Sequence, residues 1–192
     1  MQALGCALWL ALPIIVAGIF HIAAIRLNVL PSLARIPLDG GLTFRARRIF
    51  GANKTLRGLL LMVSFTILAA TGQAWLAAHV DWAREITPRE LLAAGPLKWG
   101  GLLGLGYVLG ELPNSFFKRQ IDVAPGAPGA GVLGPVFWIV DQVDSLAGAL
   151  IAMSFIWLPP WPIVVAMLIV TLVVHPLAAL GMVALGLKAR VG

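Results

Sequence analysis

The chain has 192 residues, of which 60% are hydrophobic and 11% are charged, and its mean hydropathy is +0.94. This composition excludes a soluble globular domain and places the chain in a lipid bilayer, and the length suits one compact domain. Lysine and arginine number 14 against 8 acidic residues, so the net charge is +6. Because the basic residues cluster beside apolar stretches, anionic lipid, membrane orientation and phosphorylated substrates explain them better than nucleic acid does.

Five apolar stretches of roughly 20 residues, the length that an α-helix needs to cross the hydrocarbon, follow one another along the chain. They predict an all-α, polytopic integral membrane protein with a single domain over residues 1–192. The first stretch lacks the basic start of a cleaved signal peptide, so we expect it to be retained as a membrane span. The predicted transmembrane helices cover residues 3–25, 59–78, 91–110, 132–158 and 163–187.

The distribution of basic residues between these stretches predicts the orientation of the chain. Seven lie in the first connection, three in the second, two in the third and two after the last stretch. The positive-inside rule puts the N-terminus outside, the C-terminus in the cytoplasm, and the first and third connections on the cytoplasmic face of the cell membrane. We therefore expect the functional site to face the cytoplasm. In chain order the basic residues are Arg26, Arg35, Arg45, Arg47, Arg48, Lys54 and Arg57; Arg84, Arg89 and Lys98; Lys118 and Arg119; and Lys188 and Arg190.

A basic segment, residues 47–58, leads directly into the second stretch. Its Asn53 and Thr55 favour turn or helix-cap geometry, and the N-terminus of the following helix offers free N–H groups and the positive end of the helix dipole. Together with Lys54 and Arg57, this pattern predicts a phosphate cradle. The alternative is a positively charged anchor that binds lipid headgroups.

Glu111 ends the third stretch on the predicted cytoplasmic side, from which Asp141 would also be reached. Lys118 and Arg119 follow it in the third connection. Taken alone, Glu111 can be an ordinary interfacial carboxylate, and the two basic residues can be ordinary orientation signals. Segment 124–131, rich in glycine, alanine and proline, predicts a mobile or tightly turned loop before the next stretch.

Two aspartates, Asp141 and Asp144, lie inside the apolar stretch 132–158. An ionised carboxylate near hydrocarbon costs on the order of 3 kcal/mol, so intramembrane acids usually face a polar cavity and have a function. Three residues apart on a helix, both project to one face, an arrangement that suits a divalent cation. Hard oxygen ligands with positions left for water favour Mg²⁺. The alternative is a structural pair neutralised by a neighbouring lysine or arginine.

The other residue types that commonly bind metals form no site in the sequence. No ligand spacing links His21, His79 and His175, so we expect them to be structural or interfacial. Cys6 is the only cysteine, which excludes an intrachain disulfide and a cysteine metal cluster.

Three segments carry, in this order, the motifs of one family. Segment 53–58 resembles an Asn-Lys-Thr-(aromatic)-x-Gly loop, segment 110–119 a Gly-Asp followed by Ser-x-x-Lys-Arg, and segment 141–144 an Asp-(Gln or Arg)-x-Asp. These motifs are typical of the integral-membrane CTP-dependent phosphatidate cytidylyltransferases, and the chain most closely resembles their CDP-archaeol synthase branch. Two departures are that Glu111 stands where the family usually has Asp and that Leu56 replaces a common Trp.

The resemblance implies that CTP and a membrane lipid phosphate react to a CDP-lipid and pyrophosphate, a step of phospholipid biosynthesis. The lipid is an archaeal-type ether lipid phosphate or phosphatidate, and the sequence leaves both open. A lipid phosphomonoester is already an anionic nucleophile near neutral pH, so positioning and charge neutralisation suffice for catalysis. The implied site residues are Asp141, Asp144 and Lys118 for catalysis; Asn53, Lys54, Thr55, Arg57, Ser115, Lys118 and Arg119 for CTP and lipid phosphate; and Asp141, Asp144 and Glu111 for Mg²⁺.

A non-enzymatic ion-coupled transporter or lipid-binding scaffold is the rival from another class, because intramembrane carboxylates also bind cations or protons. A transporter more often shows two related halves with broken helices, and no such repeat is visible in this sequence. The expected partners of the enzyme are CTP, the lipid phosphate and membrane lipids. Nucleic acid is not expected, and a homo-oligomer stays open.

Overall fold

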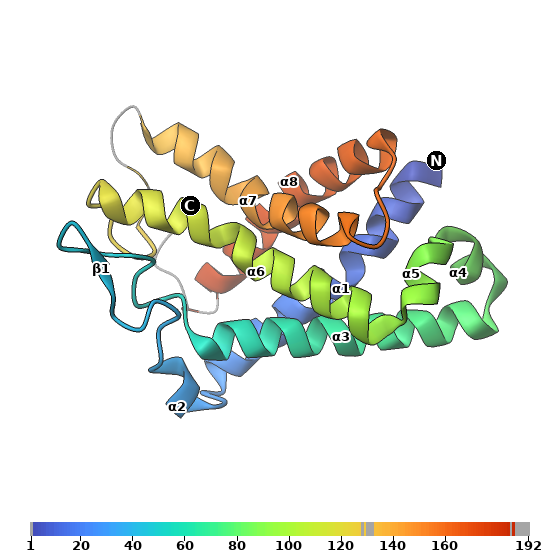
Figure 1. Cartoon of the computed structure of the whole chain (residues 1–192), viewed down its shortest axis with the longest axis horizontal. Coiled ribbons are helices and arrows are strands. Elements are labelled where there is room, and N and C mark those ends of the chain that lie inside the picture. The colour runs from blue at the N-terminus through green and yellow to red at the C-terminus, as the bar shows by residue number, and fades with distance from the viewer. Residues whose placement is uncertain (1, 128, 130–132, 185, 187–192) are drawn as a thin grey trace.

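The protein is described by a computed structural model, which defines residues 2–127, 129, 133–184 and 186. Within them the chain is almost entirely helical, which confirms the all-α class (Figure 1). The elements are α1 (Gln2–Arg26), α2 (Pro31–Ala34), β1 (Thr43–Phe44), β2 (Arg47–Arg48), α3 (Leu56–His79), α4 (Asp81–Ile86), α5 (Arg89–Ala94), α6 (Pro96–Gln120), α7 (Leu133–Ser154) and α8 (Trp161–Ala184). Val132, Leu187, Lys188 and Arg190, which belong to the predicted spans and orientation signals, lie outside the described residues, as do residues 128, 130 and 131 of the predicted loop.

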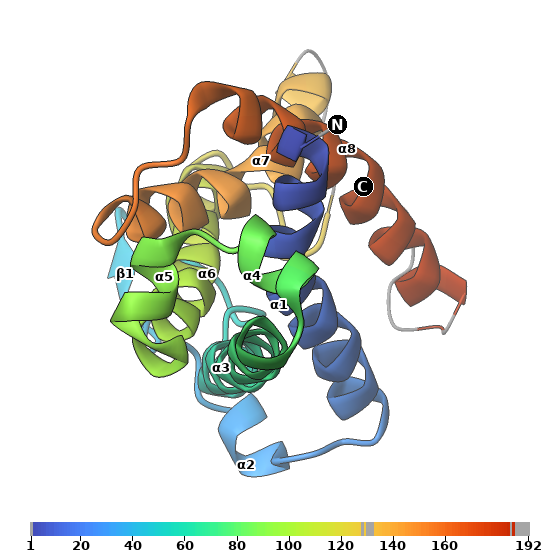
Figure 2. The same cartoon turned by 90° about the vertical axis from the view of Figure 1, so that its right-hand side faces the viewer.

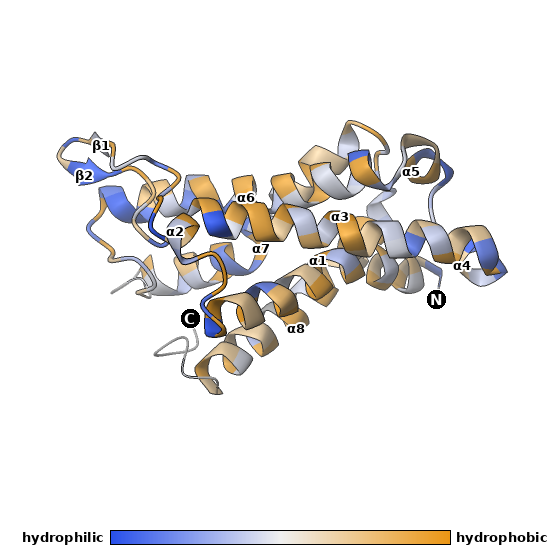
Figure 3. Cartoon of the chain, turned by 90° about the horizontal axis from the view of Figure 1, so that it is seen from below, coloured by the Kyte–Doolittle hydropathy of each residue, from blue (hydrophilic) through white to orange (hydrophobic). Residues whose placement is uncertain are grey.

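Helices α1, α3, α7 and α8 are the four, among the described residues, that are long and apolar enough to cross a membrane. At a rise of about 1.5 Å per residue, helices of this length span the hydrocarbon. No more than 33% of the apolar window of each helix is buried within the protein, so most of their surface is free to face lipid. Hydrophilic residues gather instead at the end of the molecule near β2 and around α4 at the opposite end (Figure 3).

The third predicted span differs from the structure in its bounds. Instead of one helix over residues 91–110, α5 ends before Gly95 and α6 begins at Pro96. Gly95 has a φ of +80°, a conformation that residues with a side chain rarely adopt. Pro96 then starts the new helix at a position where its missing N–H is not needed.

Helix α6 also continues past the predicted end of the span. Glu111, expected at the end of that span, and Lys118 and Arg119, expected in the third connection, all lie inside the helix. The apolar run stops at Gly110, but the helix continues because the polar side chains beyond it pair with neighbouring elements. The predicted connection therefore starts after Gln120.

Close packing through glycine holds α6 between α3 and α7, and α3, seen end-on in Figure 2, has α1 on its other side. On one face of α6, a Cβ on Gly104 would lie 3.0 Å from the Val63 Cα of α3. On another face, a Cβ on Gly106 would lie 2.6 Å from the Gly148 carbonyl oxygen of α7, and one on Gly110 would clash with the Asp144 carbonyl oxygen. Small residues of this kind let helix backbones approach closely in membranes. They set the distance between α6 and the aspartates of α7.

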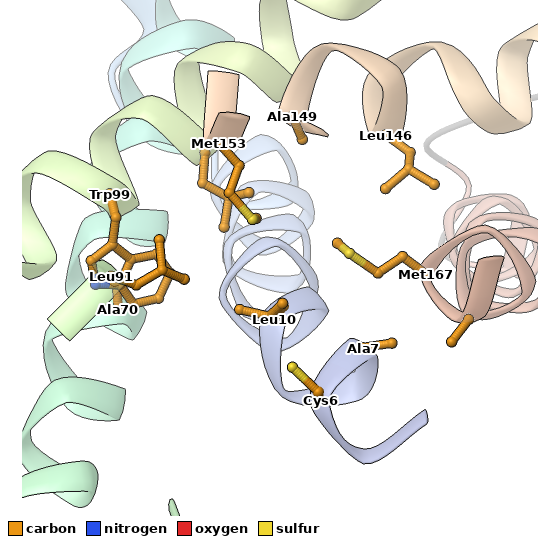
Figure 4. Close-up of a cluster of buried hydrophobic side chains, with 12 residues drawn as sticks. Cys6, Ala7, Leu10, Ala70, Leu91, Trp99, Leu146, Ala149, Met153 and Met167 are labelled. Atoms are coloured by element: carbon orange, nitrogen blue, oxygen red, sulfur yellow. The ribbon is translucent and has the colours of Figure 1, made fainter. Parts of the chain in front are cut away.

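A hydrophobic core joins α1, α3, α5, α6, α7 and α8 (Figure 4). Leu10 of α1, Leu91 of α5, Leu103 of α6 and Met167 of α8 are each at most 1% exposed. Because lipid is as apolar as these side chains, close van der Waals packing is what stabilises such a core in a membrane. This core makes the helical frame that carries the polar residues.

The connection over residues 27–55 is an ordered cap. It contains α2 and the antiparallel pair β1–β2, in which Phe44 is paired with Arg47. Arg47 binds the end of α6, because its guanidinium donates to the Gln120 carbonyl and lies 2.5 Å from Asp122 Oδ2. The cap therefore brings the first sequence motif beside the second.

Candidate active site

The three segments singled out in the sequence converge at one place. Lys54, just before α3, forms an ion pair with Glu111 of α6. Lys118, two turns further along α6, forms an ion pair with Asp141 of α7. Asp144 lies on the same side of α7 as Asp141, since one side chain contacts both. Acidic and basic residues from three parts of the chain thus form one polar cluster.

Asn114 of α6 is the side chain that contacts both aspartates. Its Nδ2 donates to Asp141 Oδ1 at 2.5 Å and to Asp144 Oδ2 at 2.8 Å. Its Oδ1 is buried and has no hydrogen-bond partner among the described residues. Asn114 was not among the site residues predicted from the sequence. Its signal was its spacing, because Glu111, Asn114 and Lys118 recur at helical intervals on one face of α6.

Lys118 neutralises Asp141. Its Nζ lies 2.6 Å from Asp141 Oδ1 and 2.5 Å from Oδ2, and Lys118 is 8% exposed. It also lies over the ring of Phe137, with Nζ 5.4 Å from the ring centroid. A lysine beside an aspartate is the arrangement that the structural alternative predicted for this pair. Asp144 differs, because in the described part of the chain no lysine or arginine forms an ion pair with it.

Ser145 connects Glu111 to the aspartates. Its Oγ lies 2.9 Å from Glu111 Oε1 and 3.1 Å from Asp144 Oδ1, and its backbone N–H donates to Asp144 Oδ1 at 2.6 Å. Ser145 is 1% exposed. Sequence reasoning missed Ser145, which adjoins Asp144 but carries no signal of its own. Glu111 is therefore part of the cluster and not a separate interfacial carboxylate.

The residues of the first motif take different positions. Thr55 caps α3, as predicted, because its Oγ1 accepts a hydrogen bond from the Gly58 N–H at 3.3 Å. Arg57 reaches the connection after α1, where its Nη1 donates to the Val29 carbonyl at 3.4 Å. Asn53 is exposed in the turn that precedes the helix. Lys54 is thus the member of the motif whose contact with the cluster is direct.

Arg119 and Ser115 are buried on α6, at 8% and 9% exposure. Arg119 faces the first connection, since its Cδ lies 3.4 Å from the position that a Cβ on Gly51 would take. Its Nε and Nη1 are buried and have no hydrogen-bond partner in the part of the chain that the structure describes. A buried guanidinium with free donors suits an anionic ligand.

The histidines were expected to be structural or interfacial. His21 of α1 lies against the start of α3, where its Cε1 is 3.6 Å from the position of a Cβ on Gly58. His79 lies at the far end of α3, and its Nδ1 is 2.7 Å from the Trp75 carbonyl oxygen. The side chain of His175 lies outside the described part of the structure.

The donor set of the cluster suits Mg²⁺. The carboxylates of Asp141 and Asp144 and the unbonded Asn114 Oδ1 are hard oxygen atoms, which this ion prefers. No group of three or more His, Cys, Asp or Glu side chains within the described ranges could hold a metal ion by itself. Mg²⁺ is commonly bound by one or two carboxylates together with substrate phosphates, so the residues fit an ion that arrives with a phosphorylated substrate.

An apolar cavity of about 610 Å³ lies between α6 and α7 beside the cluster. Its wall includes Pro113, Phe117, Phe137 and Ile151, and it reaches Asn114 and Asp144. Phe117 and Ile151 are more than 60% exposed on these membrane-embedded helices. The polar cluster is therefore bordered by a surface suited to hydrocarbon.

The arrangement of the helices shows which class of protein this is, and the sequence then shows the family. The chain is similar to the solved structure of an intramembrane enzyme for archaeal membrane lipid biosynthesis, with a TM-score of 0.62 and 24% identity over 91% of this chain and 92% of that one. At this identity the likeness shows the fold, that of an α-helical integral membrane protein. The sequence profile of the CarS-like family, described as CDP-archaeol synthase, matches residues 2–191. The chain belongs to this family of enzymes, which confirms the resemblance carried by the three motifs.

Individual relatives agree with the family assignment. The CDP-archaeol synthase of Thermofilum pendens is 34% identical over 154 residues, which are 79% of this chain and 64% of that protein. The Methanoregula boonei protein of the same name is 31% identical over 67% of this chain and 72% of its own length. That of Methanopyrus kandleri is 29% identical over 90% of this chain and 84% of its own length. The chain thus spans slightly less than two thirds of the Thermofilum protein.

Proposed function

We propose that the protein transfers a cytidylyl group from CTP to a membrane lipid phosphate and releases pyrophosphate. The observation that carries this proposal is the meeting of three carboxylates and two lysines in one cluster, next to an apolar cavity. A soluble triphosphate and a lipid headgroup must meet in such a place, because one substrate comes from water and the other keeps its chains in the bilayer. Family membership supports the same reaction.

The lipid substrate that we propose is an archaeal-type ether lipid phosphate. The support is that the relatives are named CDP-archaeol synthases. The apolar cavity beside Asp144 is suited to hold part of its chains. Phosphatidate is the second candidate, because apolar side chains distinguish ether from ester chains weakly.

In the proposed reaction an oxygen of the lipid phosphate attacks the α-phosphorus of CTP. The bond from that phosphorus to the oxygen bridging to the β-phosphate breaks, and pyrophosphate leaves with the bond electrons. The attacking phosphate is already anionic, so no protein base is required. Lys54, Lys118 and Arg119 would bind and orient the phosphates of the two substrates.

The acidic residues have a different role in the proposal. Asp141 and Asp144, with Glu111 as a third candidate, would hold Mg²⁺, which when bound neutralises charge on the triphosphate and on the departing pyrophosphate. Asn114 and Ser145 orient the carboxylates through the hydrogen bonds described above. The ion pairs keep the amino groups of Lys54 and Lys118 beside the carboxylates before the substrates bind.

The test uses purified protein in detergent with CTP, Mg²⁺ and either unsaturated archaeal-type ether lipid phosphate or phosphatidate. We expect pyrophosphate release that requires both lipid and Mg²⁺ and is faster with the ether lipid. Asp144→Asn, which keeps the shape and removes the charge, should reduce the rate by at least about a hundredfold. Absence of release with both lipids would reject the transferase. CTP-independent cation flux in proteoliposomes would then favour the transporter.

A further inference from the structure

Asp39, in the connection before α3, is a buried carboxylate outside the three motifs. Asp39 as a whole is 4% exposed, and its side chain is fully buried. A charge removed from water is costly unless hydrogen bonds replace the water. Here they do: Asp39 accepts from the backbone N–H groups of Gly41 (3.0 Å), Phe50 (3.0 Å) and Gly51 (3.1 Å), and from the guanidinium of Arg48, whose Nε is 3.2 Å away.

These bonds close the chain between Asp39 and Gly51 into a compact loop. The backbone beside Asp39 is also tied to Lys54, because the Leu38 N–H donates to the Lys54 carbonyl at 2.7 Å. Lys54 N–H in turn lies 3.4 Å from the Gly51 carbonyl oxygen. The position of Lys54, whose amino group reaches Glu111, is thus defined by the loop that Asp39 organises.

The same loop borders Arg119. Gly51 has a φ of +96°, and a Cβ there would lie 3.4 Å from Arg119 Cδ. Arg119 is buried, and its Nε and Nη1 lack hydrogen-bond partners among the residues described. The loop therefore packs one of its glycines against the aliphatic part of Arg119, whose guanidinium has donors available for an anion.

We propose that Asp39 is a positioning residue of the cytidylyltransferase site. Asp39 holds the loop in the conformation in which Lys54 and Arg119 together bind the triphosphate of CTP. Its buried side chain does not touch substrate and acts through the loop. A loop that only linked α2 to α3 would not require a buried charge that accepts five hydrogen bonds. The inference rests on the proposed function, because it assumes that CTP is the anion bound there.

The test compares Asp39→Asn with Asp122→Asn. Asp122 is a matched control, since it lies in the same region and pairs with Arg47 but has a side chain that is 69% exposed. An exposed pair of this kind contributes little. We expect Asp39→Asn to weaken CTP binding in the presence of Mg²⁺ by about tenfold or more and to raise the KM for CTP, with the KM for lipid unchanged. Asp122→Asn should change both constants less than about twofold.

The outcomes separate this inference from the function on which it rests. If the wild-type protein does not bind CTP, the proposed function and the inference about Asp39 are both rejected. If the wild type binds CTP and folded Asp39→Asn binds it equally well with a lower melting temperature, Asp39 is structural only and the inference is overturned. Should Asp39→Asn not fold, Arg48→Lys replaces it, because a lysine cannot make both guanidinium contacts. Folded Arg48→Lys with unchanged CTP affinity would also overturn the inference, and weakened affinity with unchanged lipid KM would support it.

Discussion

A single amide, that of Asn114, allows two carboxylates to lie side by side in a membrane-embedded helix pair. Each of its two N–H groups goes to one aspartate, and Lys118 adds a positive charge on Asp141. Without these donors, two negative charges at this separation would repel each other in a medium of low dielectric constant. The side-chain oxygen of Asn114 is also buried, and it remains available as a hydrogen-bond acceptor or metal ligand beside the two aspartates.

Glu111→Asp is the most informative single substitution in the site. It introduces the residue that the family usually has at this position and shortens the side chain by one methylene. The contacts of Glu111 to Lys54 and to Ser145 are made by the carboxylate at the end of the longer arm. We expect Glu111→Asp to lower the rate of pyrophosphate release roughly tenfold and to raise the Mg²⁺ concentration required. Glu85→Asp on α4 is the control. A Glu111→Ala variant with unchanged rate and Mg²⁺ dependence would remove Glu111 from the site.

Asp39 determines how the connection responds to acid. Burial alone would raise the pKa of Asp39, but the hydrogen bonds from Arg48 and from the N–H groups of Phe50, Gly41 and Gly51 outweigh burial and hold the pKa well below its usual range. The charged form therefore stabilises the folded loop fully at pH values above the unfolded pKa of about 4. This stabilisation is lost as the pH falls through the lower pKa of the folded state.

The corresponding measurement is hydrogen exchange of residues 39–51 in the wild type and in Asp39→Asn, from about pH 6 to about pH 3. At neutral pH the variant should destabilise the loop by roughly 1–3 kcal/mol, so it exchanges faster. The ratio of the two exchange rates should shrink as the pH falls. A ratio that stays constant over the whole range would show that the Asp39 charge does not stabilise the loop.

At the scale of elements, apolar run length predicted α1, α3 and α8 to within a few residues but gave the wrong start and end for α6. The hydropathy of α6 falls after Gly110, where the polar residues of the site begin, whereas its backbone hydrogen bonding continues to Gln120. What keeps that half helical and buried is pairing with α7 and with Lys54, which lie far from it in the sequence.

The same reason limits what the sequence reveals of the site. Asp141 and Asp144 are visible because charge is conspicuous in an apolar run, and Lys54 and Lys118 because they belong to motifs. Asn114 and Ser145 become recognisable only when α6 and α7 are placed together, since their partners are on the other helix. Asp39 has no helical period to mark it, and its contacts depend on the fold of an irregular loop.

Gly110→Ala tests whether the contact between α6 and α7 positions the site. The added methyl would clash with the Asp144 carbonyl oxygen, so the helices must separate. We expect a loss of roughly 1–3 kcal/mol in stability and a fall in turnover of up to about a hundredfold, since small displacements of reacting groups are costly. Gly101→Ala is the matched control on α6, because its Cβ would meet no atom closer than 3.8 Å. Equal turnover in the two variants would contradict the positioning role.

At the scale of the whole molecule, the connection 27–55 lies at one end and α4 at the other (Figure 1). The polar cluster is joined to this connection by the ion pair of Lys54 with Glu111. This connection holds five of the basic residues and is flanked by Arg26 and Arg57, which supports the proposed cytoplasmic position of the site. The short helices α4 and α5 would then face the outside. Both substrates would reach the cluster from the cytoplasmic half of the membrane.

Orientation can be measured with single cysteines in a Cys6→Ala background, because Cys6 is the only native cysteine. Ala52 and Glu90 are exposed at opposite ends of the molecule. In intact cells, a membrane-impermeant maleimide should label Glu90→Cys and should label Ala52→Cys only after permeabilisation. The reverse pattern would place the site outside the cytoplasm.

Helix α6 contacts α3 through Gly104 and α7 through Gly106 and Gly110, and this position has a consequence for how α6 inserts into the membrane. Within the described residues α6 is not among the helices apolar enough to cross a membrane unaided, since its second half carries the charged and amide groups of the site. A nascent helix of this kind gains little by partitioning into lipid alone. Helix α3 leaves the ribosome before α6 and already presents the surface that Gly104 contacts. Because of the polar residues of the site, α6 is expected to insert into the bilayer while it packs against α3. Helix α7 is synthesised next and then pairs with the charged side chains of α6.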